Sequence, residues 1–257
     1  MKYLTFIIFV FFLSNLKAQD LSLYQEETFV FENDTLHYRI LKPLNYDPDK
    51  KYPVHLFLHG AGERGNDNHA QLTHGGKLFL KKENREKYNS WVIFPQCSNN
   101  DRWPSLPADS WDKTFKKKKK KPNKSLGLVI MLMDEFIEKK QVNKEKIYAS
   151  GLSMGGMGTF EMLYRRPNMF AAATPICGNG NPRLTKLYAD KVPVWIFHGS
   201  DDNVVRPKHS LKMAKAIIKA SGSPRLTLYE NVGHDSWNNA FAEKYFLKWI
   251  HSKSKTQ

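Results

Sequence analysis

The chain has 257 residues, of which 41% are hydrophobic and 13% aromatic, so it is long enough for one α/β domain with a large core and too short for two. This composition excludes a disordered chain, and two cysteines are too few for a disulfide-stabilised scaffold. The formal net charge of +15 would suit a polyanionic partner, but six consecutive lysines at 116–121 supply much of it, and such a run is typical of a solvated loop. We therefore predict no nucleic-acid partner, and contact between this run and another polyanion stays open.

The first 18 residues have the layout of a secretory signal peptide. Lys2 is followed by an apolar run at 6–13 and then by Ala18, a small residue suited to cleavage. The apolar run is too short to cross a bilayer comfortably. We predict removal of residues 1–18, a single catalytic domain over 19–257, a secreted or periplasmic location and no stable membrane anchor. Leu16 is unusual in a cleavage signal, so a retained anchor is the alternative.

Strand and helix patterns alternate through the rest of the chain. Residues 29–41 alternate apolar and polar side chains around a Glu-Asn-Asp turn, which predicts an antiparallel hairpin. Apolar runs predict strands at 52–58, 91–94, 146–149, 171–176, 192–197 and 225–229. Helical periodicity indicates helices at 128–137, at 211–218 and, as one continuous helix, at 239–251. Since most of these strands lack a polar face, we predict a mostly parallel central sheet with an antiparallel N-terminal hairpin and helices on both faces.

The segment 97–124 has no periodicity and contains three prolines and two tryptophans as well as the lysine run. A loop of this length inside a compact domain is usually functional or disordered. We expect it to form a lid or cleft wall over the carboxyl ends of the strands, with lysines that influence substrate choice. A disulfide between Cys97 and Cys177 stays open, because nothing local in the sequence pairs them.

The stretch 149–158 reads ASGLSMGGMG and contains the pattern G-x-S-x-G between a predicted strand and a helical segment. In this context the pattern forms a sharp turn that exposes the serine as a nucleophile. Gly151 and Gly155 would lie against neighbouring backbone, where a β-carbon has no room. We therefore predict that Ser153 is a catalytic nucleophile.

A serine nucleophile needs a base to take its proton and an acid to orient that base. His234 follows the strand predicted at 225–229, and Asp202 follows the strand predicted at 192–197. The chain order Ser153, Asp202, His234 is that of α/β-hydrolases. Asp201 stays open as an alternative acid.

The negative oxygen that forms during acyl transfer needs preorganised donors, which are commonly backbone N–H groups. Met154, directly after the nucleophile, is the first expected donor. The second should come from the loop after the strand at 52–58, where we choose Ala61. His59 in this loop is expected to brace the backbone rather than to take part in chemistry.

Four segments together resemble the α/β-hydrolase superfamily: LHGAGERGNDN at 58–68, GLSMGG at 151–156, the His198-Gly199-x-x-Asp202-x-x-Val205 loop, and Gly233 to Trp237. More closely, they resemble its secreted esterases, which are related to feruloyl and acetylxylan esterases and polyhydroxybutyrate depolymerases and are sometimes labelled predicted peptidases. The resemblance implies a serine carboxylic-ester hydrolase with the triad above and with no metal or organic cofactor. It also implies a small-molecule or polysaccharide-linked ester as substrate.

The substrate and the competing functions are less well determined by the sequence. Trp103, Trp111 and Trp237 are candidates for substrate binding, with completion of a hydrophobic wall as the alternative. A serine peptidase of the prolyl-oligopeptidase kind would use a similar order of residues, but it would carry a large N-terminal gating domain. The third candidate function is that of a protein with a hydrolase-like fold that binds polyanions without catalysis. The natural acyl group, the alcohol and the oligomeric state are not determined.

Overall fold

The computed structural model describes residues 20–105 and 121–255. The predicted signal peptide, Trp111 and the lysines at 116–120 therefore lie outside the described residues. Lys121, which ends the lysine run, is described and is exposed. Within the described ranges, no helix is long and apolar enough to cross a membrane.

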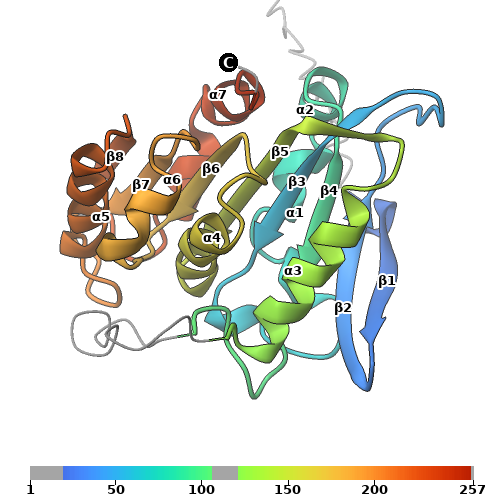
Figure 1. The fold of residues 1–257 in the computed structure, drawn as a ribbon, viewed down its shortest axis with the longest axis horizontal. Coiled ribbons are helices and arrows are strands. Elements are labelled where there is room, and N and C mark those ends of the chain that lie inside the picture. The colour runs from blue at the N-terminus through green and yellow to red at the C-terminus, as the bar shows by residue number, and fades with distance from the viewer. Residues whose placement is uncertain (1–19, 106–120, 256–257) are drawn as a thin grey trace, which may run out of the picture.

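The described residues form one eight-stranded sheet (Figure 1). Its strands in chain order are β1 (Tyr24–Phe31), β2 (Asp34–Leu41), β3 (Tyr52–Leu58), β4 (Trp91–Pro95), β5 (Val142–Leu152), β6 (Ala172–Ile176), β7 (Trp195–Gly199) and β8 (Arg225–Tyr229). In space the order is β1-β2-β4-β3-β5-β6-β7-β8. β1 pairs antiparallel with β2, and β2 pairs antiparallel with β4, whereas every later pair is parallel. The predicted antiparallel start and parallel remainder are confirmed.

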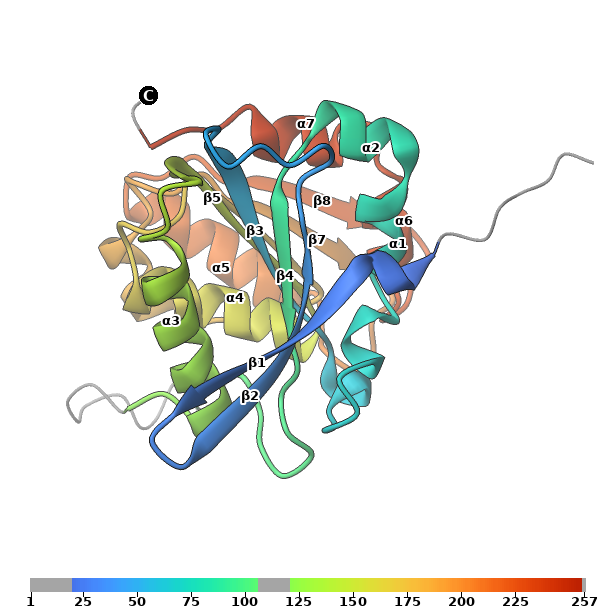
Figure 2. The same cartoon turned by 90° about the vertical axis from the view of Figure 1, so that its right-hand side faces the viewer.

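Helices cover both faces of this sheet, as Figure 2 shows. One face carries α3 (Lys124–Phe136), α4 (Met154–Arg165) and α5 (Lys208–Lys219), whose buried residues join one hydrophobic cluster. The other face carries α1 (Gly76–Leu80), α6 (Trp237–Ala242) and α7 (Phe246–His251), which contribute to a second cluster. The short helix α2 (Lys82–Lys87) follows α1. Apolar strands lie between two apolar helix layers, which explains why these strands have no polar face.

Besides the shifted bounds of strands such as β5 and β7, the structure differs from the sequence prediction at three places. The first strand begins at Tyr24, whose buried hydroxyl donates to the carbonyl of Gly76 at 2.9 Å and so anchors the chain earlier than the polar residues 25–27 suggested. The helix predicted at 239–251 is two helices, because Glu243 leaves helical geometry with ψ 117°. The apolar period continues across this break, since Phe241 and Phe246 still pack with ring centroids 6.0 Å apart. Helices α1 and α2 were not predicted.

The parallel strands direct the candidate site to one edge of the sheet. β5 ends directly before Ser153, β7 ends three residues before Asp202, and β8 ends five residues before His234. Ligands of open α/β sheets bind beyond the carboxyl ends of the strands. The three residues therefore share the edge at which such a site is expected.

Candidate active site

Ser153 lies between the last residue of β5 and the first residue of α4 with φ 51° and ψ −116°. A positive φ is uncommon for a residue with a side chain and stores strain that the surroundings must hold. Here the N–H of Ser153 donates to the carbonyl of Ile176 at 2.9 Å, and the carbonyl of Ser153 accepts from Met157 at 3.0 Å. These bonds on both sides fix the sharp turn predicted from the sequence.

The glycines around Ser153 are explained by the closeness of neighbouring backbone. A β-carbon on Gly155 would lie 1.9 Å from the carbonyl oxygen of Leu58, which belongs to the adjacent strand β3. A β-carbon on Gly151 would lie 2.3 Å from the carbonyl oxygen of Gly155. Real β-carbons do not come this close to backbone atoms. The missing side chains therefore let α4 begin directly against β3 and β5.

The structure brings Ser153, His234 and Asp202 into one chain of hydrogen bonds. Nε2 of His234 lies 2.8 Å from Oγ of Ser153, and Nδ1 lies 2.7 Å from Oδ2 of Asp202. The carboxylate is an acceptor only, so Nδ1 carries the hydrogen and Nε2 is left to accept from the serine hydroxyl. Asp202 is buried, whereas the His234 side chain is 19% exposed. A histidine in this position can receive the serine proton and remain oriented by the acid.

The two adjacent aspartates have different surroundings. The Oδ1 atom of Asp202 accepts from the N–H groups of Val204 at 2.9 Å and Val205 at 2.8 Å, while Oδ2 faces His234. Asp201 is exposed, and its Oδ1 accepts from the hydroxyl of Ser200 at 2.6 Å. The geometry therefore favours Asp202 over Asp201 as the acid.

One residue of this site received no role from the sequence. His198, the last but one residue of β7, is fully buried, and its Nε2 lies 3.1 Å from Oδ2 of Asp202 and 2.7 Å from the carbonyl oxygen of Val205. Its Nδ1 lies 2.6 Å from Oγ of Ser210 on α5. The His-Gly-x-x-Asp spacing was visible in the sequence, but spacing alone does not reveal that both histidines reach one carboxylate oxygen.

The two expected oxyanion donors both start a helix. Met154 is the first residue of α4, and Ala61 is the first residue of the short 3-10 helix η2 (Ala61–Glu63). The first N–H groups of a helix have no partner within that helix, and they carry the positive end of its dipole. The loop that holds Ala61 packs on the turn, because a β-carbon on Gly60 would lie 2.8 Å from Cδ1 of Leu152. Both N–H groups therefore belong to segments that meet next to Ser153.

His59 braces the loop after β3, as expected. Its Nδ1 donates to the carbonyl of Gly60 at 2.6 Å, and its Nε2 accepts from the N–H of Cys97 at 2.9 Å. Burial lowers the pKa of His59 to about 4, so it remains neutral at ordinary pH. Both nitrogens are occupied, which leaves neither available to a substrate.

The tryptophans expected at the substrate occupy different environments. Trp103 does not fit a place on a substrate-binding wall, because it is fully buried and its Nε1 donates to the carbonyl of His59 at 3.0 Å. Its ring packs on His59 and fills the space beside Gly158. Trp237 is partly buried and lies edge-on to His234, with ring centroids 5.6 Å apart. Only Trp237 of the described pair therefore lies beside the triad.

The described ends of the 97–124 segment are held together and tied to α4. The amide of Asn123 donates to the carbonyl of Pro104 at 2.9 Å. The N–H and hydroxyl of Ser105 both donate to Glu161, a fully buried carboxylate on α4 that also pairs with Arg165 at 2.6 Å. The two described ends therefore lie next to each other, beside α3 and α4.

Both cysteines are buried free thiols, and burial raises the pKa of each to about 12. Sγ of Cys177 lies within 4.8 Å of ligand atoms of Asp202 and His234, a grouping that could hold a metal ion. However, both nitrogens of His234 and both oxygens of Asp202 already make hydrogen bonds. The same atoms therefore serve the triad contacts, and a metal ion would have to break them.

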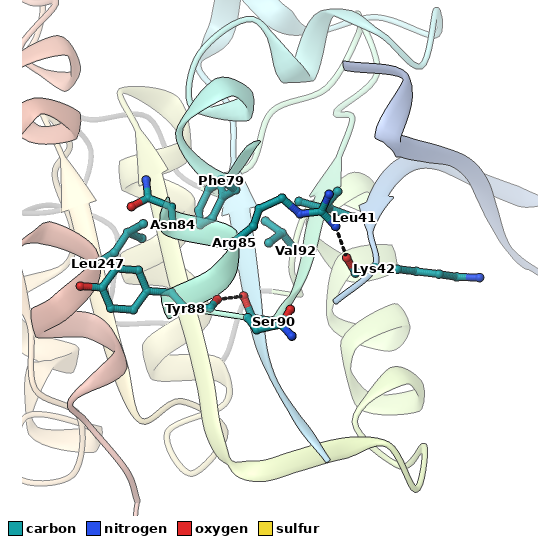
Figure 3. Close-up of a pocket in the computed structure, with 10 residues that line it drawn as sticks. Leu41, Lys42, Phe79, Asn84, Arg85, Tyr88, Ser90, Val92 and Leu247 are labelled. Atoms are coloured by element: carbon teal, nitrogen blue, oxygen red, sulfur yellow. Dashed lines mark hydrogen bonds between the residues drawn. The ribbon is translucent and has the colours of Figure 1, made fainter. Parts of the chain in front are cut away.

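A small pocket lies at the opposite end of the sheet (Figure 3). Its wall includes Ser90 and Val92 at the amino end of β4, Leu41 at the end of β2, and residues of α2 and α7. Arg85 reaches across it to donate to the carbonyl of Lys42 at 3.1 Å. Since the triad lies at the carboxyl ends of the strands, this pocket is separate from it.

Residues 46–250 match the profile of the Phospholipase/Carboxylesterase family. This match covers most of the chain, and the chain belongs to that family. The resemblance to α/β-hydrolases is thereby confirmed for the fold and the family.

Two curated relatives extend the comparison. The chain is 30% identical over 166 residues to the bifunctional acetylxylan esterase/xylanase of Neocallimastix patriciarum. This alignment covers 65% of this chain and 21% of the relative. It is 24% identical over 265 residues to an uncharacterized secreted protein of Arthroderma benhamiae, and this alignment covers 87% of this chain and 26% of the relative. The chain therefore spans about a quarter of the length of these relatives.

Solved structures share the fold over almost the whole chain. A thermostable esterase superposes with a TM-score of 0.82 and 31% identity, over 91% of this chain and 64% of the other. A ferulic acid esterase gives a TM-score of 0.66 at 17% identity, over 89% and 97% of the two chains. An acylaminoacyl peptidase of Pyrococcus horikoshii gives 0.64 at 15% identity, over 91% and 42%. The last two identities are low, so these two structures show similarity of fold alone.

Proposed function

We propose that the protein is a serine carboxylic-ester hydrolase that works through an acyl-enzyme. The observation that carries this proposal is the hydrogen-bonded chain from Ser153 through His234 to Asp202 at the carboxyl edge of the sheet. Membership of the Phospholipase/Carboxylesterase family supports the same reaction.

The proposed reaction begins when Oγ of Ser153 attacks the ester carbonyl carbon while Nε2 of His234 takes the hydroxyl proton. The carbonyl oxygen becomes negative and accepts from the N–H groups of Ala61 and Met154. The bond between carbon and the alcohol oxygen then breaks, and the alcohol leaves with the proton from Nε2. Water then attacks the acyl carbon while Nε2 of His234 takes one of its protons. The bond between the acyl carbon and Oγ breaks, Oγ receives that proton from Nε2, and the carboxylic acid leaves.

Acetyl or feruloyl esters of plant polysaccharide are the proposed substrates. Support comes from the acetylxylan esterase/xylanase of Neocallimastix patriciarum, at 30% identity over 65% of this chain. Trp237 is the proposed aromatic contact, because it is partly exposed beside His234. The proposed partner is thus a small-molecule or polysaccharide-linked ester.

Export of the protein is also proposed, with residues 1–18 as signal peptide and 19–257 as one catalytic domain. The relative from Arthroderma benhamiae is described as a secreted protein, which agrees with this proposal. Polysaccharide esters are too large to enter a cell unaided, so an enzyme that acts on them has to meet them outside the cytoplasm. No specific observation favours the peptidase or the non-catalytic alternative.

The test compares wild-type protein with Ser153→Ala on acetyl, feruloyl and longer acyl esters, carried by small alcohols and by polysaccharide. We expect ester hydrolysis by the wild type and its loss in the variant, because no acyl-enzyme can form without Oγ. Ser223→Ala changes an exposed serine in the loop before β8 and serves as the matched control. Hydrolysis by folded Ser153→Ala at the control rate would contradict the proposal.

A further inference from the structure

His198 joins three separate groups below the candidate triad. It is fully buried, and its ring lies between Ser210 on α5 and the loop that follows β7. Two oxygen atoms lie near Nε2: Oδ2 of Asp202 at 3.1 Å and the carbonyl oxygen of Val205 at 2.7 Å. Neither oxygen carries a hydrogen, so both can only accept. Nε2 must therefore carry a hydrogen, which the two acceptors share.

The other ring nitrogen fits the same tautomer. Nδ1 lies 2.6 Å from Oγ of Ser210, and the carbonyl oxygen of Gly178 lies 3.4 Å from the same hydroxyl. The hydroxyl has one hydrogen, and the shorter contact is the one to Nδ1. Burial lowers the pKa of His198, so the ring is neutral and has a single N–H. The two acceptors at Nε2 therefore set the tautomer, and Nδ1 is left to accept from the hydroxyl of Ser210.

We propose that His198 is a positioning residue of the reaction, which holds the carboxylate of Asp202 in the orientation that His234 requires. This inference rests on the proposed ester hydrolysis. Oδ1 of Asp202 accepts from the N–H groups of Val204 and Val205. The N–H of His198 is shared between Oδ2 of Asp202 and the carbonyl oxygen of Val205. Both carboxylate oxygens are therefore hydrogen-bonded, and these bonds restrict rotation of the Asp202 side chain.

The same hydrogen bond has an electrostatic consequence. Oδ2 of Asp202 accepts from both His234 at 2.7 Å and His198 at 3.1 Å, so the second donor withdraws part of the negative charge that faces His234. Loss of this donor leaves more charge to stabilise protonated His234. Since catalysis needs neutral His234 as base, the acid limb of the pH profile of kcat/KM should move to higher pH. The N–H groups of Val204 and Val205 still hold Oδ1 in such a variant, so Asp202 stays beside His234. A loss of stability that left the hydrogen bonds of Asp202 unchanged would not move the limb.

Other titratable groups around this carboxylate do not obscure that readout. Cys177 lies within 4.8 Å of Asp202 and His234, and burial raises its pKa to about 12, so its thiol stays neutral. Asp201, Arg206, Glu230 and Asp235, the other acidic and basic residues on the two adjoining loops, are exposed and screened by solvent. His198 is therefore the buried group whose removal changes the charge that faces His234.

The experiment replaces His198 with Gln or Asn, two amide side chains that differ only by one methylene group in length. In His198→Gln the amide lies where Nε2 was and can still donate to Asp202, whereas in His198→Asn it lies near Nδ1 and reaches Ser210 alone. We expect His198→Asn to lower kcat about tenfold or more and to shift the acid limb upward by roughly half a pH unit. His198→Gln should recover most of kcat and return the limb to the wild-type position.

His55→Asn is the matched structural control. His55 is also fully buried and lies on a strand, and its Nε2 is 2.7 Å from the hydroxyl of Ser150, but it makes no contact with the acid loop. We expect this variant to melt at lower temperature and to keep the wild-type kcat and pH profile while folded. Equal kcat and equal acid limbs in the Asn and Gln variants of His198 would overturn the inference. A failure of the proposed function is distinguishable, because Ser153→Ala would then retain turnover.

Discussion

At the scale of single residues, the environment of Asp202 separates it from Asp201. The carboxylate of Asp202 is buried against His234 and two backbone N–H groups, whereas the carboxylate of Asp201 is exposed and accepts from the hydroxyl of Ser200. Asp202→Asn should lower kcat by about three to four orders of magnitude, because an amide cannot orient and stabilise a protonated histidine. Asp201→Asn should change kcat less than about threefold, since its side chain is solvated.

Steady-state rates on one activated acetyl ester decide between the two acids. Circular dichroism of both variants serves as the control for folding. A larger loss in Asp201→Asn than in Asp202→Asn would move the acid to position 201.

Ser153, Asp202 and His234 could be predicted from the sequence, because each follows a predicted strand and because their chain order is that of α/β-hydrolases. It could not predict Trp103, since a tryptophan in a loop looks the same whether its ring faces substrate or is buried against His59. The role of His198 was hidden for a related reason. Two histidines 36 residues apart in the chain meet at one carboxylate only after β7 and β8 have paired.

At the scale of elements, the turn from β5 to α4 depends on the closeness of β3. Gly155→Ala would place a β-carbon 1.9 Å from the carbonyl oxygen of Leu58, so strand or helix must move. We expect a loss of roughly 3 kcal/mol in the free energy of unfolding, together with loss of ester hydrolysis. Gly62→Ala is the control, because no atom lies within 4 Å of its added carbon and its effect should stay within about 0.5 kcal/mol.

Urea unfolding of the two variants measures this difference. Equal stability of Gly155→Ala and Gly62→Ala would show that the turn can relax, and the steric explanation of the glycines would be wrong.

Strands were the best predicted elements, because a strand covered on both faces reads as an apolar run. β8 was predicted with the bounds that the structure has, and β3 likewise. Helix ends were harder, since the break at Glu243 interrupts the backbone while the apolar period continues from α6 into α7. Short helices such as α1, with five residues, contain too little of a helical period to be detected.

At the scale of the whole molecule, buried histidines link stability to pH. Burial lowers the pKa of His251 to about 3 and of His59 to about 4, and it lowers the pKa of His55 well below its ordinary value. In the unfolded chain these histidines bind protons near pH 6.5, whereas in the fold they stay neutral. The unfolded state therefore binds more protons as the pH falls, and stability is full above about pH 6.5 and declines below it.

His251→Phe tests this linkage at one position. The ring of His251 packs 4.9 Å from that of Tyr148, and its Nε2 is buried without a partner, so an apolar ring of similar shape should fit. Removal of one such histidine should reduce the fall in unfolding free energy between pH 6.5 and 5 by about 1 to 2 kcal/mol. Urea unfolding at several pH values measures the slope, and an unchanged slope in the variant would show that His251 already binds its proton in the fold.

The central claim, that Ser153 is the nucleophile of an acyl-enzyme, is tested most directly by covalent trapping. The purified protein is treated with a fluorophosphonate, and mass spectrometry of the intact chain and its peptides locates the adduct. We predict one adduct per chain on the peptide that contains Ser153, its absence in Ser153→Ala, and much slower formation in His234→Ala. An adduct on another residue, or none on a preparation that hydrolyses esters, would contradict the claim.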